Sequence, residues 1–406
     1  MADLLDFDTA LTRILAAATP LGTVEHQLAD AAGHCLAEPI FARLTQPPFD
    51  ASAMDGYAVV ADAVVPNLPM PVAGRSEAGN GFAGTCPRGA AIRIFTGAPL
   101  PAGTDTVVMQ EDVVADGDRV TLSVRPNPGQ HIRRRGSDFA EGAPLLAKGT
   151  RLTPGALSLA AASGHGTLAV TRRPRLALLM TGDELVPPGT KPGPDRIVAS
   201  NGAGLFGLLA PLCRRIDDLG IAGDDEAVLG AHLAAALAGD ADVIVTTGGA
   251  SVGDRDFVKK VLGDLGAPPD LWRIAMRPGK PLMFARHGDK LVFGLPGNPV
   301  SALTTAVTLL VPALRALAGD ADPGPHLVTL PLAEALGPNG PRRHFHRARL
   351  VDTESGLLVA PLPETDSAHL SSFARADALI VHHELSPALA AGTPVKVLFL
   401  GAVTPR

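Results

Sequence analysis

The feature that most constrains this chain is an apolar run that leads into a glycine-rich turn, DVIVTTGGASVG at residues 242–253. Residues 242–246 are typical of a buried strand, and a helix is expected to follow at residues 256–265. The N-terminus of such a helix presents free N–H groups and the positive end of its dipole, which suits phosphate. A plain tight connection is the alternative. The density of glycines and hydroxyls favours a ligand site, and these residues are Thr246, Thr247, Gly248, Gly249, Ser251 and Gly253.

Strands alternate with helices on both sides of this turn, which predicts βαβ units and a parallel sheet. Further strands are expected at residues 175–180 and 215–221, and further helices at residues 201–212, 225–238 and 299–317. The central α/β domain is therefore placed at residues 174–320. It is one of four predicted units, the others being an elongated N-terminal domain at 1–48 and 132–173, an inserted small β domain at 49–131 and a C-terminal β domain at 326–406.

The outer units are predicted from their pattern of apolar runs and turn residues. Short apolar runs between glycine and proline turns, at residues 57–60, 91–95 and 106–109, indicate the inserted β domain. The chain has 406 residues, of which 46% are hydrophobic, so several cores can form. Within the N-terminal domain we expect helices at residues 6–18, 25–36 and 154–162.

Composition argues against several function classes. The net charge of −6 gives no support for a nucleic-acid partner, which a basic face would mark. No apolar run is expected to reach the roughly 18 residues of a membrane span, so no membrane partner is predicted. The start of the chain lacks a basic segment followed by an apolar core, and we expect a cytoplasmic protein. Cys35, Cys86 and Cys213 are widely spaced, which favours reduced thiols over a metal or redox site.

Carboxylates follow several of the predicted strands. TGDEL at residues 181–185 ends the first strand, and Asp224 and Asp225 follow the second. Because the carboxyl ends of parallel strands share one edge, these side chains are expected to converge near the glycine-rich turn. Each alone is more typical of a solvated or helix-capping carboxylate. Together they favour a Mg²⁺ site, with Asp183, Glu184, Asp225 and Asp256 as ligands.

Positive charge comes from RPGKP at residues 277–281, where Arg277 and Lys280 flank a tight turn. The two side chains are either solvated loop cations or an oxyanion site, in which Arg binds two oxygens and Lys acts as a point charge. LPGNPVS at residues 295–301 predicts a rigid turn entering a helix. Asn298 is expected to cap that helix, with Pro299 at its first position.

The N-terminal half holds three polar stretches whose local interpretation is plain. Asp55 and Gly56 predict a hairpin turn, and Thr96 begins a loop. Three arginines at residues 133–135 stand beside Asp138, and spacing alone indicates a solvated basic patch.

Taken together, these stretches resemble the molybdopterin molybdenumtransferases, the family of bacterial MoeA and the gephyrin E domain. The resemblance covers essentially the whole chain. It rests on PPFDASAMDGYAV (47–59), IRIFTGAPLPAGTDTVV (92–108), HIRRRGSDF (131–139), TGDEL (181–185), TTGGASVGDRDF (246–257), RPGKP (277–281), GLPGNPVSA (294–302) and LSSFARADALIV (370–381).

The resemblance implies an α/β multidomain fold, with a central parallel-sheet molybdopterin-binding domain, an elongated N-terminal domain, an inserted β domain and a C-terminal β domain. It also implies a homodimer whose active site lies between the central domain of one subunit and the N-terminal region of the other. The implied reaction takes adenylylated molybdopterin and molybdate to molybdenum cofactor and AMP, with Mg²⁺ in support. Hand-over from a molybdopterin adenylyltransferase and to molybdoenzymes is expected on the same basis.

Carried over by matching position, the resemblance assigns roles to individual residues. Catalytic roles fall to Asp55, Glu184, Asp225, Asp256, Arg277 and Lys280. Substrate binding falls to Thr96, Arg133, Asp138, Thr247, Gly248, Gly249, Ser251, Pro296, Asn298 and Pro299. The chain departs from the family pattern at three positions, with Arg277 in place of the usual Lys, and with Ser137 and Asp254 where Glu is common.

Two other functions compete with this one. Molybdopterin adenylylation is performed by proteins that share the central domain alone, and the N-terminal stretches argue against it. A non-enzymatic scaffold, as in the gephyrin branch, needs a large exposed apolar groove. The chain shows no long linker or appended anchoring segment that would favour this role.

Overall fold

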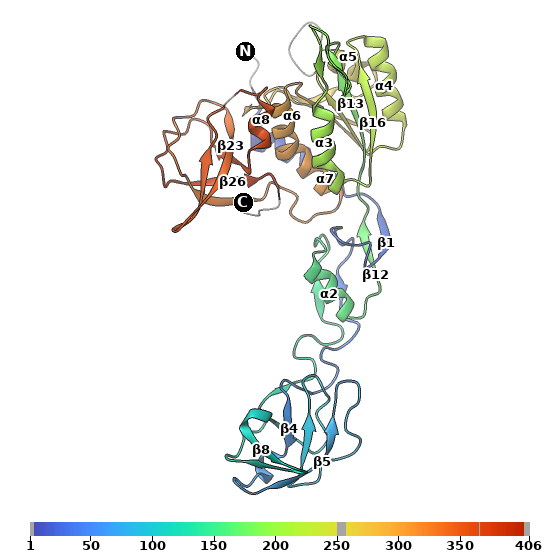
Figure 1. Ribbon diagram of the computed structural model, residues 1–406. Helices are drawn as coiled ribbons and strands as arrows, with labels where there is room; N and C mark the ends of the chain where they lie inside the picture. Colours follow the sequence, from blue (N-terminus) through green and yellow to red (C-terminus); the bar gives the residue numbers. More distant parts are fainter. Residues whose placement is uncertain (1–3, 250–256, 365, 402–406) are drawn as a thin grey trace.

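The computed structural model of the protein describes residues 4–249, 257–364 and 366–401. The molecule is elongated, with a small β unit at one end and a wider end where the central α/β unit lies beside the C-terminal β unit (Figure 1). A narrow part that contains the helix α2, Pro154–Ala162, joins the two ends. The predicted fold class is confirmed, whereas the residue bounds between the units stay predictions.

The central sheet has six strands in the order β16-β13-β17-β21-β20-β18. The first four pair in parallel, as predicted, whereas β20 and β18 pair antiparallel. A two-residue hairpin loop at Gly288 and Asp289 joins β20 to β21, and such a short connection allows only antiparallel pairing. The strands are β13 Arg175–Thr181, β16 Arg215–Ala222, β17 Val243–Thr247, β18 Pro269–Trp272, β20 Met283–His287 and β21 Lys290–Leu295.

Helices cover both faces of this sheet. Alternate residues of β13 point to opposite sides, so Leu176 and Leu178 join one core while Ala177 and Leu179 join the other. The first core includes α3 (Asn201–Leu209), followed by η3 (Ala210–Leu212), and the continuous helix α6 (Pro299–Thr305), η4 (Ala306–Leu310) and α7 (Val311–Leu317). The second includes α4 (Glu226–Ala238) and α5 (Phe257–Asp264).

The helix Pro299–Leu317 corrects the expectation that no apolar run is long enough to span a membrane. It has 19 residues and a mean hydropathy of 1.7. Because 89% of this stretch is buried inside the protein, its apolar surface is accounted for by the core of the central unit.

The N-terminal unit differs from expectation in one element. The helix α1, Phe7–Ala17, is present and is capped by Asp6, whose Oδ1 accepts from the Thr9 N–H at 2.9 Å. The helix expected at residues 25–36 is wrong, because β1, Thr23–Gln27, pairs antiparallel with β12, Thr167–Thr171. This pairing joins segments that are about 140 residues apart, so a local helical pattern gives no sign of it.

The inserted unit is a six-stranded sheet in the order β7-β4-β6-β5-β9-β8. Three two-stranded pairs, β1–β12, β2–β11 and β3–β10, lead from the central unit to it. The strands are β2 Ile40–Phe41, β3 Ala51–Ser52, β4 Gly56–Val59, β5 Met70–Ser76, β6 Ala91–Ile94, β7 Thr106–Met109, β8 Val113–Asp116, β9 Arg119–Leu122, β10 Ile132–Arg133 and β11 Pro144–Leu146, with the short helices η1 Ala61–Ala63 and η2 Gln110–Asp112.

The C-terminal unit takes its edge strand from the central part of the chain. Its sheet runs β19-β23-β25-β26-β22, and β19, Met276–Arg277, pairs in parallel with β23, Arg343–Thr353. This pairing fixes the segment that carries Arg277 directly to the C-terminal sheet. The remaining elements are β22 Leu327–Pro331, β24 Gly356–Pro361, α8 Leu370–Ala374, β25 Ala378–His382 and β26 Pro394–Phe399, together with the small pair β14 Leu185–Val186 and β15 Ile197–Val198.

Candidate active site

A pocket of about 690 Å³ opens at the carboxyl ends of β13 and β17. The chain passes from β13 to β16 on one side of the sheet and then to β17 on the other, so the direction of winding reverses between β13 and β17. In open α/β sheets, the crevice at such a reversal is where ligands bind. The prediction that the glycine-rich turn lies at a ligand-binding edge therefore agrees with the topology.

The two glycines of the turn are required by close packing against β13 and α5. Gly248 has φ +89°, and a Cβ added there would lie 2.3 Å from the Thr181 backbone oxygen. Gly249 has φ +60°, and its Cβ would lie 2.6 Å from a methyl group of Val258. The turn is held further by a hydrogen bond from the Thr181 hydroxyl to the Thr247 carbonyl, at 3.3 Å. The glycines thus bring Thr247, Gly248 and Gly249 to the pocket wall.

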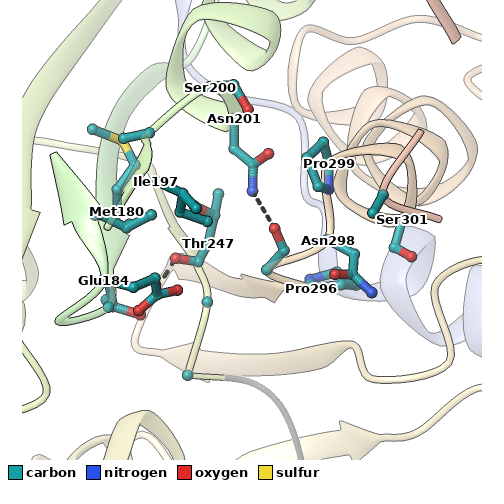
Figure 2. A pocket seen from close by; sticks show the side chains of 18 of the residues that line it. Met180, Glu184, Ile197, Ser200, Asn201, Thr247, Pro296, Asn298, Pro299 and Ser301 are labelled. Atoms are coloured by element: carbon teal, nitrogen blue, oxygen red, sulfur yellow. Dashed lines mark hydrogen bonds between the residues drawn. The ribbon is translucent and has the colours of Figure 1, made fainter. Parts of the chain in front are cut away.

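The walls of this pocket differ in chemistry. Figure 2 shows Met180, Ile197 and Thr247 on one side, facing Pro299 and Ser301 on the other. The short β14–β15 pair and Leu370 on α8 add further apolar side chains to the lining. Such a mixture of apolar wall and polar rim suits a flat heterocycle that carries a charged group.

Asn201, at the start of α3, lines the pocket and was not identified from the sequence. Its Nδ2 donates to the Gly297 carbonyl at 2.8 Å, which ties α3 to the turn before α6 (Figure 2). Its Oδ1 is buried and has no hydrogen-bond partner within the described chain. An acceptor without a partner beside a pocket is a group that a ligand donor would satisfy.

A second cavity of about 500 Å³ adjoins the first, since Pro281, Asn298 and Ser301 line both. Arg277 and Lys280 line it, as the oxyanion interpretation requires. Arg342 adds a third cation from the C-terminal unit, which the sequence did not indicate. We name this second cavity the cation pocket. Its described lining comprises Arg277, Pro278, Gly279, Lys280, Pro281, Asn298, Ser301, Arg342, Asp366 and Ser367.

Asn298 occupies the predicted helix-cap position, with Pro299 at the first helical position. Its side chain makes no capping hydrogen bond, which corrects the expected local role. It donates instead to Ser367 Oγ at 3.0 Å, while the Ser367 carbonyl accepts from the Val300 N–H at 3.1 Å. Asn298 therefore links the central unit to the C-terminal unit between the two cavities.

The predicted carboxylate site is brought together only in part. Glu184 and Asp224 line the first pocket, and Asp183 Oδ1 accepts from the Asp224 N–H at 2.9 Å. Asp225 caps α4 through Oδ1, which accepts from the Ala227 and Val228 N–H groups, both at 2.9 Å. Within the described ranges, no three His, Cys, Asp or Glu side chains form a group able to hold a metal ion.

Four residues singled out from the sequence lie outside the described residues: Ser251, Gly253, Asp254 and Asp256. The metal hypothesis included Asp256, so the described carboxylates test only part of it. Without Asp256, Asp183, Glu184 and Asp225 do not constitute a Mg²⁺ site by themselves.

The remaining predicted residues lie at the far end of the molecule, in or beside the inserted unit. Asp55 Oδ1 accepts from both the backbone N–H and the hydroxyl of Thr96, at 2.7 and 2.8 Å. These two hydrogen bonds hold the pKa of the Asp55 carboxyl below its usual value, and the bond from the backbone N–H has the larger effect. Arg133, on β10, and Asp138 are exposed near the same unit, as is the departure Ser137. None of the four predicted residues lines either pocket described above.

Three histidines lie on the C-terminal sheet behind Arg277. His344 pairs in register with Arg277 on one side and with His382 on the other, and His346 Nε2 lies 3.2 Å from His382 Nδ1. Burial lowers the pKa of His344 to about 2 and that of His346 to about 4, and neighbouring positive charge acts in the same direction. Both imidazoles are neutral at pH 7, so the positive charge near the cation pocket comes from Arg277, Lys280 and Arg342.

Comparison with known proteins agrees with this architecture. Three family profiles match: the MoeA N-terminal region (domain I and II) at residues 5–164, a "Probable molybdopterin binding domain" at 177–316, and the MoeA C-terminal region (domain IV) at 329–400. The chain is 37% identical to the molybdopterin molybdenumtransferase of Haemophilus influenzae over 385 residues, covering 93% of this chain and 94% of that protein.

Two further relatives span almost the full length. The molybdopterin molybdenumtransferase of Synechococcus elongatus is 36% identical over 411 residues, covering 97% of this chain and 99% of that protein. The crystal structure of the molybdopterin biosynthesis MoeA protein from Pyrococcus horikoshii matches with a TM-score of 0.83 and 26% identity, covering 98% of this chain and 100% of that chain. With pockets at the expected sheet edge and matches along its whole length, this chain belongs to the molybdopterin molybdenumtransferase family of molybdenum cofactor biosynthesis.

Proposed function

We propose that this protein inserts molybdenum from molybdate into adenylylated molybdopterin and releases AMP. The observation that carries the proposal is the pair of adjoining cavities. The larger one is partly apolar and lies beside a glycine-rich turn, and the described lining of the other includes three cations. The first suits a pterin with its phosphate, and the second suits a compact doubly charged oxyanion such as molybdate.

The chemistry asked of the protein is mainly positioning and charge stabilisation. Cleavage of the phosphoanhydride by water leaves AMP and the phosphate of the cofactor, and negative charge develops on the departing oxygens. Arg277 and Lys280 hold positive charge in the cation pocket, which adjoins the first pocket. Thr247 and the turn at Gly248 and Gly249 orient the pterin phosphate.

The position of Arg277 bears on whether the change from the usual Lys preserves the site's positive charge. Arg277 lines the cation pocket together with Lys280, so the substitution leaves a cation at this place. A guanidinium binds two oxygens of a tetrahedral anion at once, whereas an ammonium is a point charge. The proposal therefore keeps Arg277 as a ligand of the molybdate oxygens.

Mg²⁺ dependence belongs to this proposal and not to the described geometry. Glu184 lines the pocket, and one oxygen of Asp183 is already used by the Asp224 N–H. No step of the mechanism above depends on the ion. Removal of divalent ions by a chelator, followed by stepwise return of Mg²⁺, tests whether AMP release requires it.

The proposal also includes a homodimer in a cytoplasmic location. Asp55, Thr96, Arg133 and Asp138 have roles only if the inserted unit of one subunit reaches the pockets of another. The elongated shape in Figure 1, which holds the inserted unit away from the chain's own pockets, supports this arrangement. Hand-over of substrate from an adenylyltransferase and of product to molybdoenzymes would occur at the open side of the same cavities.

The adenylyltransferase and scaffold alternatives are not favoured. The named molybdenumtransferase relatives match over 93–97% of this chain, well beyond the central unit that adenylylation would require.

The deciding experiment is a product assay with adenylylated molybdopterin, with and without molybdate. AMP release that depends on molybdate supports insertion. A parallel assay with molybdopterin and ATP tests adenylylation, which would appear as consumption of ATP with release of pyrophosphate and no response to molybdate.

A further inference from the structure

The N-terminal segment of the chain lies against residues 273–275, which lead directly into the strand that carries Arg277. Leu5 forms a parallel bridge with Ile274, and the Ala275 N–H donates to the Leu5 carbonyl at 2.7 Å. Two residues later α1 begins, and Phe7 is buried with its ring 5.2 Å from that of Phe345 on β23. The start of the chain therefore contacts the segment directly before β19 as well as β23, and the pairing of β19 with β23 brings the central and C-terminal units together.

A buried arginine completes this contact. Arg343, at the start of β23, is only 8% exposed. Its two terminal nitrogens donate to the two oxygens of Asp8 at 2.6 and 2.8 Å, and its Nε lies 3.2 Å from Glu384 Oε1. The guanidinium also lies over the Phe7 ring, 5.0 Å from its centre. A two-pronged bond from a planar guanidinium fixes orientation as well as distance.

The backbone of Arg343 connects this anchor to the cation pocket. Its N–H donates to the Ala275 carbonyl at 2.8 Å, and the next pair in register is Arg277 with His344. The residue before it, Arg342, lines the cation pocket. Successive side chains of a strand point to opposite faces, so Arg343 points toward Asp8 while its neighbours in sequence point away from it. A shift of β23 relative to β19 would change the separation of Arg277 and Arg342 directly.

From this arrangement we propose that Arg343, held by Asp8 of α1, is a positioning residue that sets the spacing of Arg277 and Arg342 around the bound oxyanion. The inference rests on the proposed function, because it assigns molybdate to the cation pocket. Arg343 itself touches no substrate. Asp8 and Glu384 balance the charge of Arg343. Arg277 and Arg342 face the pocket, whereas Arg343 only fixes the strands that carry them.

The test compares variants of the full-length protein in the molybdate-dependent AMP assay. Arg343→Met removes the anchor, and Asp8→Asn weakens it at a side chain that is 69% exposed and therefore tolerant of change. We expect the KM for molybdate to rise about tenfold in Arg343→Met and by a smaller factor in Asp8→Asn, because sub-ångström misplacement of ligands is costly. The KM for adenylylated molybdopterin should stay within about twofold.

A matched control is Arg315→Met. Arg315 is a comparably buried arginine, with 12% of its side chain exposed against 10% for Arg343. It pairs with Asp320, and neither residue lines the first pocket or the cation pocket. This variant should lose thermal stability while keeping the wild-type KM for molybdate. The double variant Asp8→Asn/Arg343→Met should be no worse than Arg343→Met alone, since both changes break one contact.

The outcomes separate the inference from the proposed function. Wild-type protein that releases no AMP in response to molybdate overturns the proposed function. Wild-type activity combined with an unchanged KM for molybdate in Arg343→Met or Asp8→Asn overturns the positioning role alone. If Arg343→Met fails to fold, the two variants of Asp8 decide the question. Asp8→Asn should raise the KM for molybdate, and Asp8→Glu, which keeps the carboxylate, should bring it back toward the wild-type value. A KM for molybdate that is the same in both variants contradicts the inference.

Discussion

The pocket edge of the central unit and the Asp55 turn of the inserted unit both carry residues that the family resemblance assigns to the site, yet the structure places these residues in different surroundings. At the pocket edge, Thr247, Pro296 and Lys280 come from separate connections and meet around two adjoining cavities. In the inserted unit, Asp55 and Thr96 meet each other through two hydrogen bonds at an exposed surface. The order of the strands assembles the site of the central unit. The Asp55 turn, in contrast, lies on an exposed surface of the inserted unit.

This contrast teaches how much a single chain can complete alone. Parallel strands place their carboxyl ends on one edge, so the sheet itself gathers the pocket residues. The Asp55 turn joins β3 to β4, and it is not the predicted hairpin, because β3 pairs with β10 whereas β4 pairs with β6 and β7. It has no such geometry to enclose it. The difference is explained if a second subunit supplies the missing wall, and each experiment below tests one side of that explanation.

The largest effect is expected at the cation pocket. Lys280→Ala removes one of three cations there and should lower molybdate-dependent AMP release by about 100-fold, the usual cost of losing a charge-stabilising donor. The measurement is steady-state turnover at saturating substrate. Lys260→Ala is the control, because Lys260 makes only an exposed ion pair with Glu226, and its turnover should match wild type. Equal turnover of the Lys280→Ala and Lys260→Ala variants would contradict a role of the cation pocket in the reaction.

The second effect tests whether the two regions work across a subunit boundary. Asp55→Asn should be strongly impaired alone, as should Lys280→Ala. When the two variants are co-expressed and assemble at random, about half of the dimers are mixed, and each mixed dimer has one intact site. Activity should then return to about a quarter of wild type. Failure to recover any activity from mixed dimers, with dimer formation verified by mass, would show that the Asp55 turn does not serve a partner's pocket.

The third effect is expected at the group that the sequence did not indicate. Asn201→Ala removes a buried acceptor and the hydrogen bond to Gly297, so the pocket loses a ligand contact and the support of the turn before α6. We expect the KM for adenylylated molybdopterin to rise about tenfold, the size of one polar contact. The KM for molybdate serves as the internal control and should change little. A larger change for molybdate than for the pterin substrate would contradict this division between the cavities.

Sequence reasoning succeeded where a local pattern determines the structure. The turn at Gly248, the helices beginning at Phe7, Pro154 and Pro299, and the placement of Arg277 near Lys280 follow from spacing within a few residues. It failed where distant segments decide. Residues 23–27 became a strand because β12 pairs with them, and the side chain of Asn298 turned to Ser367 instead of capping its helix.

The site shows the same limit. Asn201 and Arg342 are ordinary residues in their local context, and only the packing of α3 and β23 against the turn before α6 and against β19 places them at the cavities. The family resemblance supplied the long-range information for Asp55 and Thr96, whose local pattern indicates no more than a hairpin and a loop.

The smallest effect separates the two regions by their response to acid. His344 and His346 have folded-state pKa values below the usual 6.5, so the unfolded chain binds protons first as the pH falls. Their region therefore loses stability as the pH falls from about 6.5, down to about 4 for His346 and to about 2 for His344. The loss is up to about 1.4 kcal/mol per pH unit for each histidine. The pKa of Asp55 is lower in the folded protein than in the unfolded chain. Its contribution to stability is therefore present above the unfolded pKa and is lost only as the pH falls through the folded pKa.

The measurement is amide hydrogen exchange at pH 7 and pH 5, corrected for intrinsic rates. Exchange should be faster at pH 5 in β23 and unchanged in β6. His344→Asn should reduce the acceleration in β23, and equal acceleration in both strands would show that burial of these histidines does not distinguish the two regions.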